Sequence, residues 1–203
     1  MKKNIAVFAS GNGSNFQAIL EAIKKGKLKA NLKLLVCDNP QAYVLERAKK
    51  AQVKSFLIER KNYQTKKEFE GEIIKNLEAE EIGLVILAGF MRILSADFIR
   101  QHKFRILNIH PALLPSFKGA QAIRDAFIYG VKVTGVTVHF VDEQTDHGPI
   151  VLQEPVKIRP EETMKSLEKK IHKLEHKIYP LAIQLFIRKQ LKIEGRLVKV
   201  RKG

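Results

Sequence analysis

Short apolar runs alternate with amphipathic helical stretches along the first half of the sequence. The runs are rich in Ile, Val and Leu, as in strands buried on both faces, and cover residues 5–9, 33–37, 84–87 and 105–109. Between them, apolar residues recur at spacings of three and four, as in crossover helices, over residues 15–25, 42–51, 66–80 and 95–102. This alternation predicts an α/β fold with a doubly wound, mostly parallel open sheet and helices on both faces.

The second half of the sequence has a different pattern. We expect a helix at 119–129 and then two extended segments joined by a polar loop, at 133–141 and 149–155. Residues 163–189 have a helical period, but Pro180 lacks an N–H group, so two helical pieces are expected there. The last segment, residues 191–200, is expected to be an edge strand or a tail.

Length and composition indicate one catalytic domain, residues 1–203. The chain is 45% hydrophobic and 29% charged, as in soluble globular proteins, and contains no repeats or domain linkers. Its basic start, residues 1–3, is followed by an apolar run too short for a signal peptide, and residues 84–91 are too few to cross a bilayer. The single cysteine, Cys37, cannot form an internal disulfide, so a cytoplasmic protein is expected.

The chain is strongly basic, with 37 Lys and Arg against 21 Asp and Glu and a net charge of +16. Such a charge suits either a nucleic acid or a solvated surface that attracts small anions. We favour the second interpretation, because no groove-reading motif or interleaved aromatic pattern is present. The expected partners are therefore small-molecule substrates, with no nucleic acid and no membrane.

The first predicted strand ends in a glycine-rich loop, Ser-Gly-Asn-Gly-Ser-Asn at residues 10–15, and a helix follows. Glycine lets backbone N–H groups approach an anion, and a helix N-terminus carries partial positive charge, so the loop suits a phosphate monoester. A dinucleotide fingerprint would need a third glycine where Phe16 stands, and the lysine of a Walker loop is absent. A plain tight turn remains the alternative.

Asn108 and His110 lie at the carboxyl end of a predicted buried strand, and strand alternation puts both on one face. A side-chain amide can donate a hydrogen bond to a developing oxyanion, while an imidazole donates or shuttles a proton. This pair favours acyl transfer. A hydrogen-bonded structural histidine is the alternative.

An acidic turn follows the predicted strand at 133–141. One of its carboxylates, Asp142, Glu143 or Asp146, could reach His110, orient it and raise its pKa, so that the cation is available near neutral pH. Ordinary turn chemistry is the alternative. A metal site is not expected, because no Cys pair or metalloprotease spacing accompanies the histidines at 110, 139, 147, 172 and 176.

Four motifs together carry a resemblance that runs nearly end to end. The sequences at 11–15, 87–94 and 108–115 and the turn that contains Asp146 are similar to those of the phosphoribosylglycinamide formyltransferase family. The resemblance implies a Rossmann-like formyltransferase fold. It also implies formyl transfer from the cosubstrate 10-formyltetrahydrofolate to the amine of 5-phosphoribosylglycinamide in de novo purine (IMP) biosynthesis, by direct attack through a tetrahedral intermediate. A formyltetrahydrofolate hydrolase of the same superfamily shares the Asn-x-His and Asp pattern and is the alternative.

The resemblance also assigns roles to individual residues. The catalytic group would be Asn108, His110 and Asp146. The phosphorylated amine would be bound by Gly13, Ser14, Asn15, Phe16, Gln17 and Glu175. The folate would contact Lys66, Met91, Arg92, Ile93, Leu94, Asn108, Asp142, Glu143, Gln144, Thr145 and Asp146.

Some positions depart from the pattern of the family. Lys66 stands where an arginine is usual, His172 replaces a glutamine near the phosphate, and His147 replaces a glycine after Asp146. Lysine lacks the planar fork of arginine, so the folate contact of Lys66 is the least secure of these roles. The segment 119–123 lacks histidines that relatives often carry.

Overall fold

The computed structural model describes residues 3–201, which form two compact units that divide after Leu107. Residues 1–2 and 202–203, the ends of the predicted domain, lie outside the described residues, as does most of the basic start.

The first unit alternates strands and helices, as the sequence predicts. Its elements are β1 (Lys3–Phe8), α1 (Ser14–Lys24), β2 (Ala30–Cys37), α2 (Val44–Lys50), β3 (Lys54–Leu57), a 3₁₀ turn (Arg60–Asn62), α3 (Lys66–Ala79), β4 (Leu84–Leu87) and α4 (Ala96–Gln101). The strand order is β3-β2-β1-β4, and β1 pairs in parallel with both β2 and β4, as β2 does with β3. The predicted parallel sheet is therefore confirmed in this unit.

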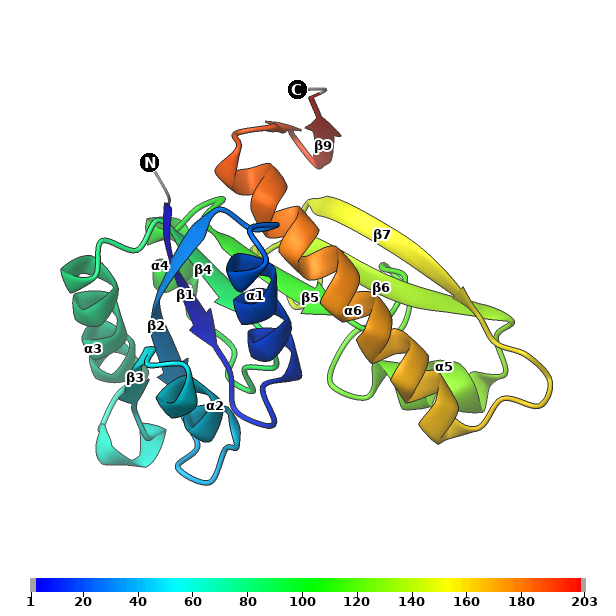
Figure 1. Cartoon of the computed structure of the whole chain (residues 1–203), viewed down its shortest axis with the longest axis horizontal. Helices are drawn as coiled ribbons and strands as arrows, with labels where there is room; N and C mark the ends of the chain where they lie inside the picture. The colour runs from blue at the N-terminus through cyan, green and yellow to red at the C-terminus, as the bar shows by residue number, and fades with distance from the viewer. Residues whose placement is uncertain (1–2, 202–203) are drawn as a thin grey trace. The chain divides into compact units, whose positions relative to one another are not determined.

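The apolar runs form the core of this sheet. Ile5 to Phe8 of β1 are fully buried, and so are all four residues of β4, while α1 and α2 lie over β1 and β2 (Figure 1). The strand β3 was not predicted, because its side chains are mostly exposed and its sequence contains no continuous apolar run. The other strands could be predicted because a strand that is buried on both faces consists of a continuous apolar run.

The second unit contains a smaller α/β arrangement. Its elements are β5 (Ile106–His110), which begins at the division between the units, α5 (Ala122–Tyr129), β6 (Val133–Phe140), β7 (Ile150–Lys157), α6 (Met164–Ile187), β8 (Leu191–Glu194) and β9 (Leu197–Val200). The strand order is β5-β6-β7, with β6 and β7 antiparallel, and α6 packs against both of them (Figure 1).

Two predictions for the C-terminal part are wrong. The long helix is not divided at Pro180, because the missing N–H removes a single helical hydrogen bond, while the buried face of α6 continues through Ile178, Tyr179, Pro180 and Ile183. The last segment is not a single edge strand or a tail. It folds back on itself as the antiparallel β8–β9 hairpin, with Gly195 at φ +60° in a two-residue turn.

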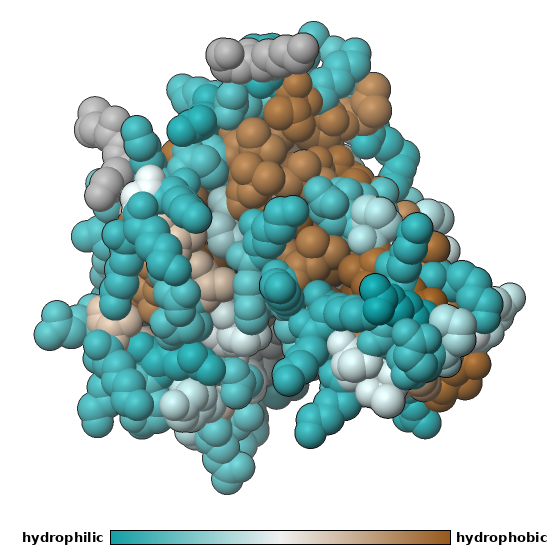
Figure 2. Space-filling model, turned by 45° about the vertical axis from the view of Figure 1, so that its right-hand side comes forward, coloured by the Kyte–Doolittle hydropathy of each residue, from teal (hydrophilic) through white to brown (hydrophobic). Residues whose placement is uncertain are grey.

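The surface is mostly hydrophilic, as the high content of Lys, Arg and Glu requires. Figure 2 shows hydrophilic side chains over much of one face, with apolar side chains gathered in its upper part. Exposed large apolar residues of the C-terminal part include Leu181, Leu197 and Val200. None of the helices within residues 3–201 is long and apolar enough to cross a membrane.

Gly13, the N-cap residue of α1, provides a test of how tightly the glycine loop is packed. Its φ is +74°, and a Cβ there would lie 2.5 Å from the side chain of Val44 in α2. Gly26 also has a positive φ, +69°, but a Cβ there meets nothing within 4 Å. We expect Gly13→Ala to destabilise the protein by about 1–3 kcal/mol more than Gly26→Ala, since only Gly13 adds overlap to backbone strain. Urea unfolding of both variants measures the difference, and equal losses would contradict it.

Candidate active site

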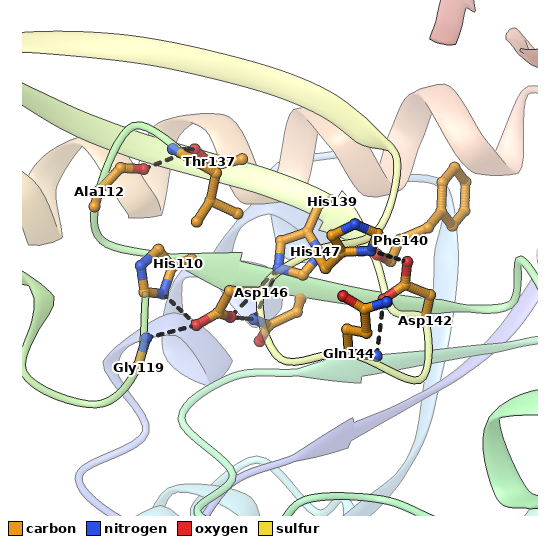
Figure 3. A network of polar contacts seen from close by, with 12 residues as sticks. His110, Ala112, Gly119, Thr137, His139, Phe140, Asp142, Gln144, Asp146 and His147 are labelled. Atoms are coloured by element: carbon orange, nitrogen blue, oxygen red, sulfur yellow. Dashed lines mark hydrogen bonds and ion pairs between the residues drawn. The ribbon is translucent and has the colours of Figure 1, made fainter. Parts of the chain in front are cut away.

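The carboxylate of Asp146 connects several polar groups of the second unit (Figure 3). Its Oδ2 atom accepts a hydrogen bond from the backbone N–H of Gly119 at 2.8 Å and lies 3.4 Å from Nδ1 of His110. Its Oδ1 atom accepts a hydrogen bond from Nδ2 of Asn108 at 3.4 Å and lies 3.7 Å from Nε2 of His139. The three residues that the sequence proposed as a catalytic group are thus neighbours, and His139 joins them.

The strands explain why these side chains meet. Asn108 and His110 are two residues apart on β5 and therefore point to one face, while His139 is the last residue but one of β6. Asp146 lies in the loop between β6 and β7 with φ +48°. The loop closes tightly after it, because a Cβ on Gly148 would lie only 1.9 Å from the carbonyl oxygen of Phe140.

His110 is almost fully buried, with 4% of its surface exposed. Its Nε2 atom lies 2.8 Å from the carbonyl oxygen of Phe117, and because a carbonyl oxygen can only accept, Nε2 carries a hydrogen. Burial lowers the pKa of His110, although the charge of Asp146 and the Phe117 carbonyl oppose that effect. The prediction of a raised pKa is therefore wrong: desolvation outweighs the carboxylate, and the ring is neutral near pH 7.

In Asp146, unlike in His110, the neighbouring groups outweigh the effect of burial and stabilise the charged form. Burial opposes its ionised form, but the His139 imidazole, the Gly119 N–H group and His110 together lower the pKa of Asp146 to about 2. The site therefore contains a fixed negative charge beside a neutral imidazole.

His139 fixes the side-chain amide of Asn108. The Nδ1 atom of His139 donates to the carbonyl oxygen of Phe140 at 2.7 Å, and its Nε2 atom lies 3.2 Å from Nδ2 of Asn108. From the sequence, His139 is a candidate only for a metal site, and this contact is not predicted. Alternation along β6 places it on one face with Thr137, and that pattern is the signal that could have identified it.

The segment that follows His110 is bound to the strands beside it. The Thr137 hydroxyl donates to the carbonyl of Ala112 at 2.7 Å and accepts from the N–H of Leu114 at 3.1 Å (Figure 3). Gln153 of β7 donates to the carbonyl of Leu114 at 2.9 Å. These contacts hold the chain next to His110 in one conformation.

The other acidic residues of the β6–β7 loop have different surroundings. Asp142 accepts hydrogen bonds from Nδ1 of His147, at 2.7 Å, and from the N–H of Gln144, at 3.1 Å. Glu143 is exposed, as are the predicted folate contacts Gln144 and Thr145. Of the three carboxylates that the sequence left open, Asp146 is the one whose contact with His110 the structure records.

Glu175, the predicted ribose contact, is a buried residue of α6. One of its carboxylate oxygens lies 3.0 Å from Nδ1 of His172. This hydrogen bond raises the pKa of His172 above its ordinary value, against the effect of burial. The charged form of His172 is therefore favoured by Glu175, whose carboxylate balances that charge.

In the first unit, the glycine loop is held by α2. The N–H of Val44 donates to the carbonyl of Gly11 at 3.1 Å, and Arg47 donates to the backbone carbonyl of Asn12 at 2.8 Å and to its side-chain oxygen at 3.0 Å. Arg47 is not predictable from the sequence, because nothing in its local pattern distinguishes it from other surface cations.

The predicted phosphate contacts lie at the start of α1. Gly13 has no side chain to cap the helix, and Ser14 and Gln17 are partly exposed, whereas Asn15 and Phe16 are buried. Phe16 is fully buried, so only its backbone could reach a ligand. The first turn of α1 thus provides the partial positive charge of a helix N-terminus.

The predicted folate contacts at 91–94 follow β4 in a loop that is fixed by a buried carboxylate. Arg92 donates to one oxygen of Asp38 at 2.6 Å, and Ser10 donates to the other at 2.5 Å while accepting from the N–H of Met91 at 2.9 Å. Met91 and Ile93 expose 68% and 73% of their surface, whereas Leu94 is buried.

Lys66, the least secure of the predicted folate contacts, is the first residue of α3. Its ammonium group lies 4.0 Å from Glu70, which is buried and accepts a hydrogen bond from the N–H of Ser95 at 2.7 Å. Its side chain remains 45% exposed. Among residues 3–201, no group of three or more His, Cys, Asp or Glu side chains is arranged to hold a metal ion.

Comparisons with known proteins agree on one family. Residues 3–183 match the formyl transferase family. The phosphoribosylglycinamide formyltransferase of Bacillus subtilis (strain 168) is 48% identical over 182 residues, which are 90% of this chain and 93% of that protein. The crystal structure of glycinamide ribonucleotide transformylase 1 from Symbiobacterium toebii superimposes with a TM-score of 0.96 and 40% identity, over 99% of this chain and 95% of that one. The predicted Rossmann-like formyltransferase fold is thereby confirmed.

A formyltetrahydrofolate deformylase from Pseudomonas syringae pv. tomato has the same fold at a larger sequence distance. Its structure superimposes with a TM-score of 0.92 but only 20% identity, and this chain covers 67% of it. The likeness concerns the fold alone.

The low pKa of Asp146 predicts a specific loss of stability in acid. A carboxylate whose pKa falls from 3.8 to about 2 on folding stabilises the folded state above pH 3.8 by about 2 kcal/mol, and this contribution disappears as the pH falls through 2. We expect the stability difference between the unaltered protein and Asp146→Asn to shrink by about 1 kcal/mol between about pH 5 and about pH 3. Denaturant unfolding across this range measures it.

Asp97→Asn is the control for that experiment, since the side chain of Asp97 is 85% exposed. Its stability difference from the unaltered protein should change less over the same pH range. If Asp146→Asn follows the pH dependence of Asp97→Asn, the Asp146 carboxylate does not have the lowered pKa.

Proposed function

The chain belongs to the phosphoribosylglycinamide formyltransferase family, and we propose that it transfers the formyl group of 10-formyltetrahydrofolate to the amine of 5-phosphoribosylglycinamide in de novo purine (IMP) biosynthesis. The observation that carries this proposal is the group formed by Asn108, His110 and Asp146, in which the ionised carboxylate of Asp146 contacts both a side-chain amide and a buried imidazole. Direct formyl transfer needs these functions and no covalent enzyme intermediate.

The proposed chemistry begins with attack of the amine on the formyl carbon. The Asn108 amide and the Nε2–H group of His110 would donate hydrogen bonds to the oxygen on which negative charge develops. The attacking amine releases a proton. Because Nε2 of His110 already carries a hydrogen, the ring would take up that proton at Nδ1, where the carboxylate of Asp146, ionised above about pH 2, would stabilise the imidazolium. The bond between the formyl carbon and the folate nitrogen then breaks, the imidazolium gives the proton to that nitrogen, and tetrahydrofolate leaves with the formyl group on the amine.

This role requires present contacts of both donors to open. The Nδ2 group of Asn108 donates to Asp146 and lies 3.2 Å from Nε2 of His139. The Nε2–H group of His110 is occupied by the carbonyl of Phe117, and the formyl oxygen would have to take the place of that carbonyl. Phe117 has a φ of +50°, a conformation that is unfavourable for a residue with a side chain. Release of this segment on substrate binding would therefore cost little backbone stability.

The two substrates would be bound by groups with matching chemistry. The start of α1, with Gly13, Ser14, Asn15, Phe16 and Gln17, suits the phosphate of the amine substrate. Glu175 suits the hydroxyl groups of a ribose, since a carboxylate can accept hydrogen bonds from both of them.

The exposed apolar side chains of Met91 and Ile93 suit the flat ring of a folate, which supplies the formyl group. Lys66, Arg92, Leu94 and the turn at residues 142–146 would complete the folate contacts.

We propose that residues 1–203 form a single formyltransferase domain, because the family match covers residues 3–183. We also propose that it works in the cytoplasm, since its single cysteine, Cys37, is a buried thiol outside any disulfide.

The direct test is formyl transfer from 10-formyltetrahydrofolate to 5-phosphoribosylglycinamide, followed as tetrahydrofolate production. We expect transfer that depends on the amine, and a kcat lowered by at least about 100-fold in both His110→Ala and Asp146→Asn, because both groups act on the transition state. Circular dichroism of each variant checks that it is folded.

Asp125→Asn on the exposed face of α5 is the matched control and should keep the activity of the unaltered protein. Release of formate without the amine, and no transfer to it, would favour the hydrolase over the transferase. Activity that survives in both site variants would contradict the assigned catalytic group.

A further inference from the structure

The β8–β9 hairpin lies beyond residues 3–183, the part of the chain that matches the family. Its two-residue turn consists of Gly195 and Arg196, between the paired residues Glu194 and Leu197. The hairpin therefore presents a guanidinium group at its tip, and the mechanism proposed above gives that group no role.

Arg196 contacts the loop that carries Asp146. Its Nη2 atom donates to the backbone carbonyl of His147 at 2.6 Å, and its Nη1 atom lies 3.1 Å from Nε2 of the same residue. The same Nη1 atom lies 3.3 Å from Nδ1 of the ring, so the guanidinium lies over the face of the imidazole, while Nδ1 donates to Asp142 at 2.7 Å. One guanidinium thus holds both the backbone and the side chain of the residue directly after Asp146.

Other contacts hold the β8–β9 hairpin, and with it Arg196, in place. The N–H of Arg201 donates to the carbonyl of Gln190 at 2.8 Å and closes the open end of the hairpin, while β9 packs against β7. The position of Arg196 is therefore set by the same unit that contains Asp146.

We propose that Arg196 is a positioning residue for Asp146. By holding the carbonyl of His147, it fixes the turn at residues 142–148 and keeps the Asp146 carboxylate opposite His110. The expected effect on turnover rests on the proposed formyltransferase function, whereas the effect on the loop does not.

Loss of Arg196 should affect the loop at residues 142–148 more than the global free energy of unfolding. Arg196 is exposed, and exposed polar contacts of this kind contribute little to the global free energy of unfolding. The local effect is larger, because Asp146 has a positive φ and its backbone conformation depends on what surrounds it. Loss of Arg196 should therefore loosen the loop and leave the fold unchanged.

The experiment compares Arg196→Ala with Lys192→Ala, which removes a positive charge from the same hairpin without a recorded contact to the loop. Amide hydrogen exchange is measured for residues 142–148, together with Tm and with kcat and KM for formyl transfer. For Arg196→Ala we expect exchange in the loop to be about 10-fold faster and kcat to be about 10-fold lower, with Tm and the KM of the amine substrate close to those of the unaltered protein. Lys192→Ala should match the unaltered protein in all four measurements.

Hydrogen exchange keeps the two proposals distinguishable. If the unaltered protein has no transferase activity, the proposed function fails, and the exchange measurement still decides whether Arg196 holds the loop. Unchanged exchange in Arg196→Ala, or a kcat equal to that of Lys192→Ala, overturns the positioning role. Arg196→Lys should restore only part of the lost kcat, because an ammonium cannot reach the carbonyl and the ring together; full restoration would mean that charge alone matters.

Discussion

The buried carboxylate of Asp146 is the interaction on which the site in the second unit depends. A carboxylate removed from water must find donors for its oxygens, and here they come from the N–H of Gly119 and the amide of Asn108, with His110 and His139 beside it. These groups are far apart in the sequence and meet only because β5 and β6 are neighbours. The charge in turn limits the orientations of the side chains around it.

Burial and charge act differently on the two titrating partners. Asp146 keeps its charge because several donors compensate for the lost hydration, whereas His110 has too few compensating contacts and is neutral. The positive charge would therefore appear only when a proton moves onto the ring during the reaction. Stabilisation that is stronger for the transition state than for the resting state is what accelerates a reaction. The neutral imidazole is thus compatible with catalysis, although the sequence had suggested a cation.

The sequence predicted those features that arise from burial or from local spacing. Apolar runs identified β1, β2, β4 and β5, and alternation along β5 grouped Asn108 with His110. The exposed strand β3 has no such pattern. The continuity of α6 through Pro180 depends on tertiary packing, which overrides a local preference. The choice of Asp146 over its acidic neighbours, and the contact of His139, depend on three-dimensional proximity that spacing does not encode.

The conformation of the backbone indicates how His110 is kept in place. Phe117 and Asp146, which face opposite nitrogens of its ring, both have a positive φ, +50° and +48°. Each such residue costs on the order of 1 kcal/mol or more and persists only where the surroundings determine it. Thr137 and Gln153 bind the chain just before Phe117, and the short turn through Gly148 confines Asp146. Two strained residues held from outside can therefore orient one buried imidazole, which a relaxed loop on either side would leave free to rotate.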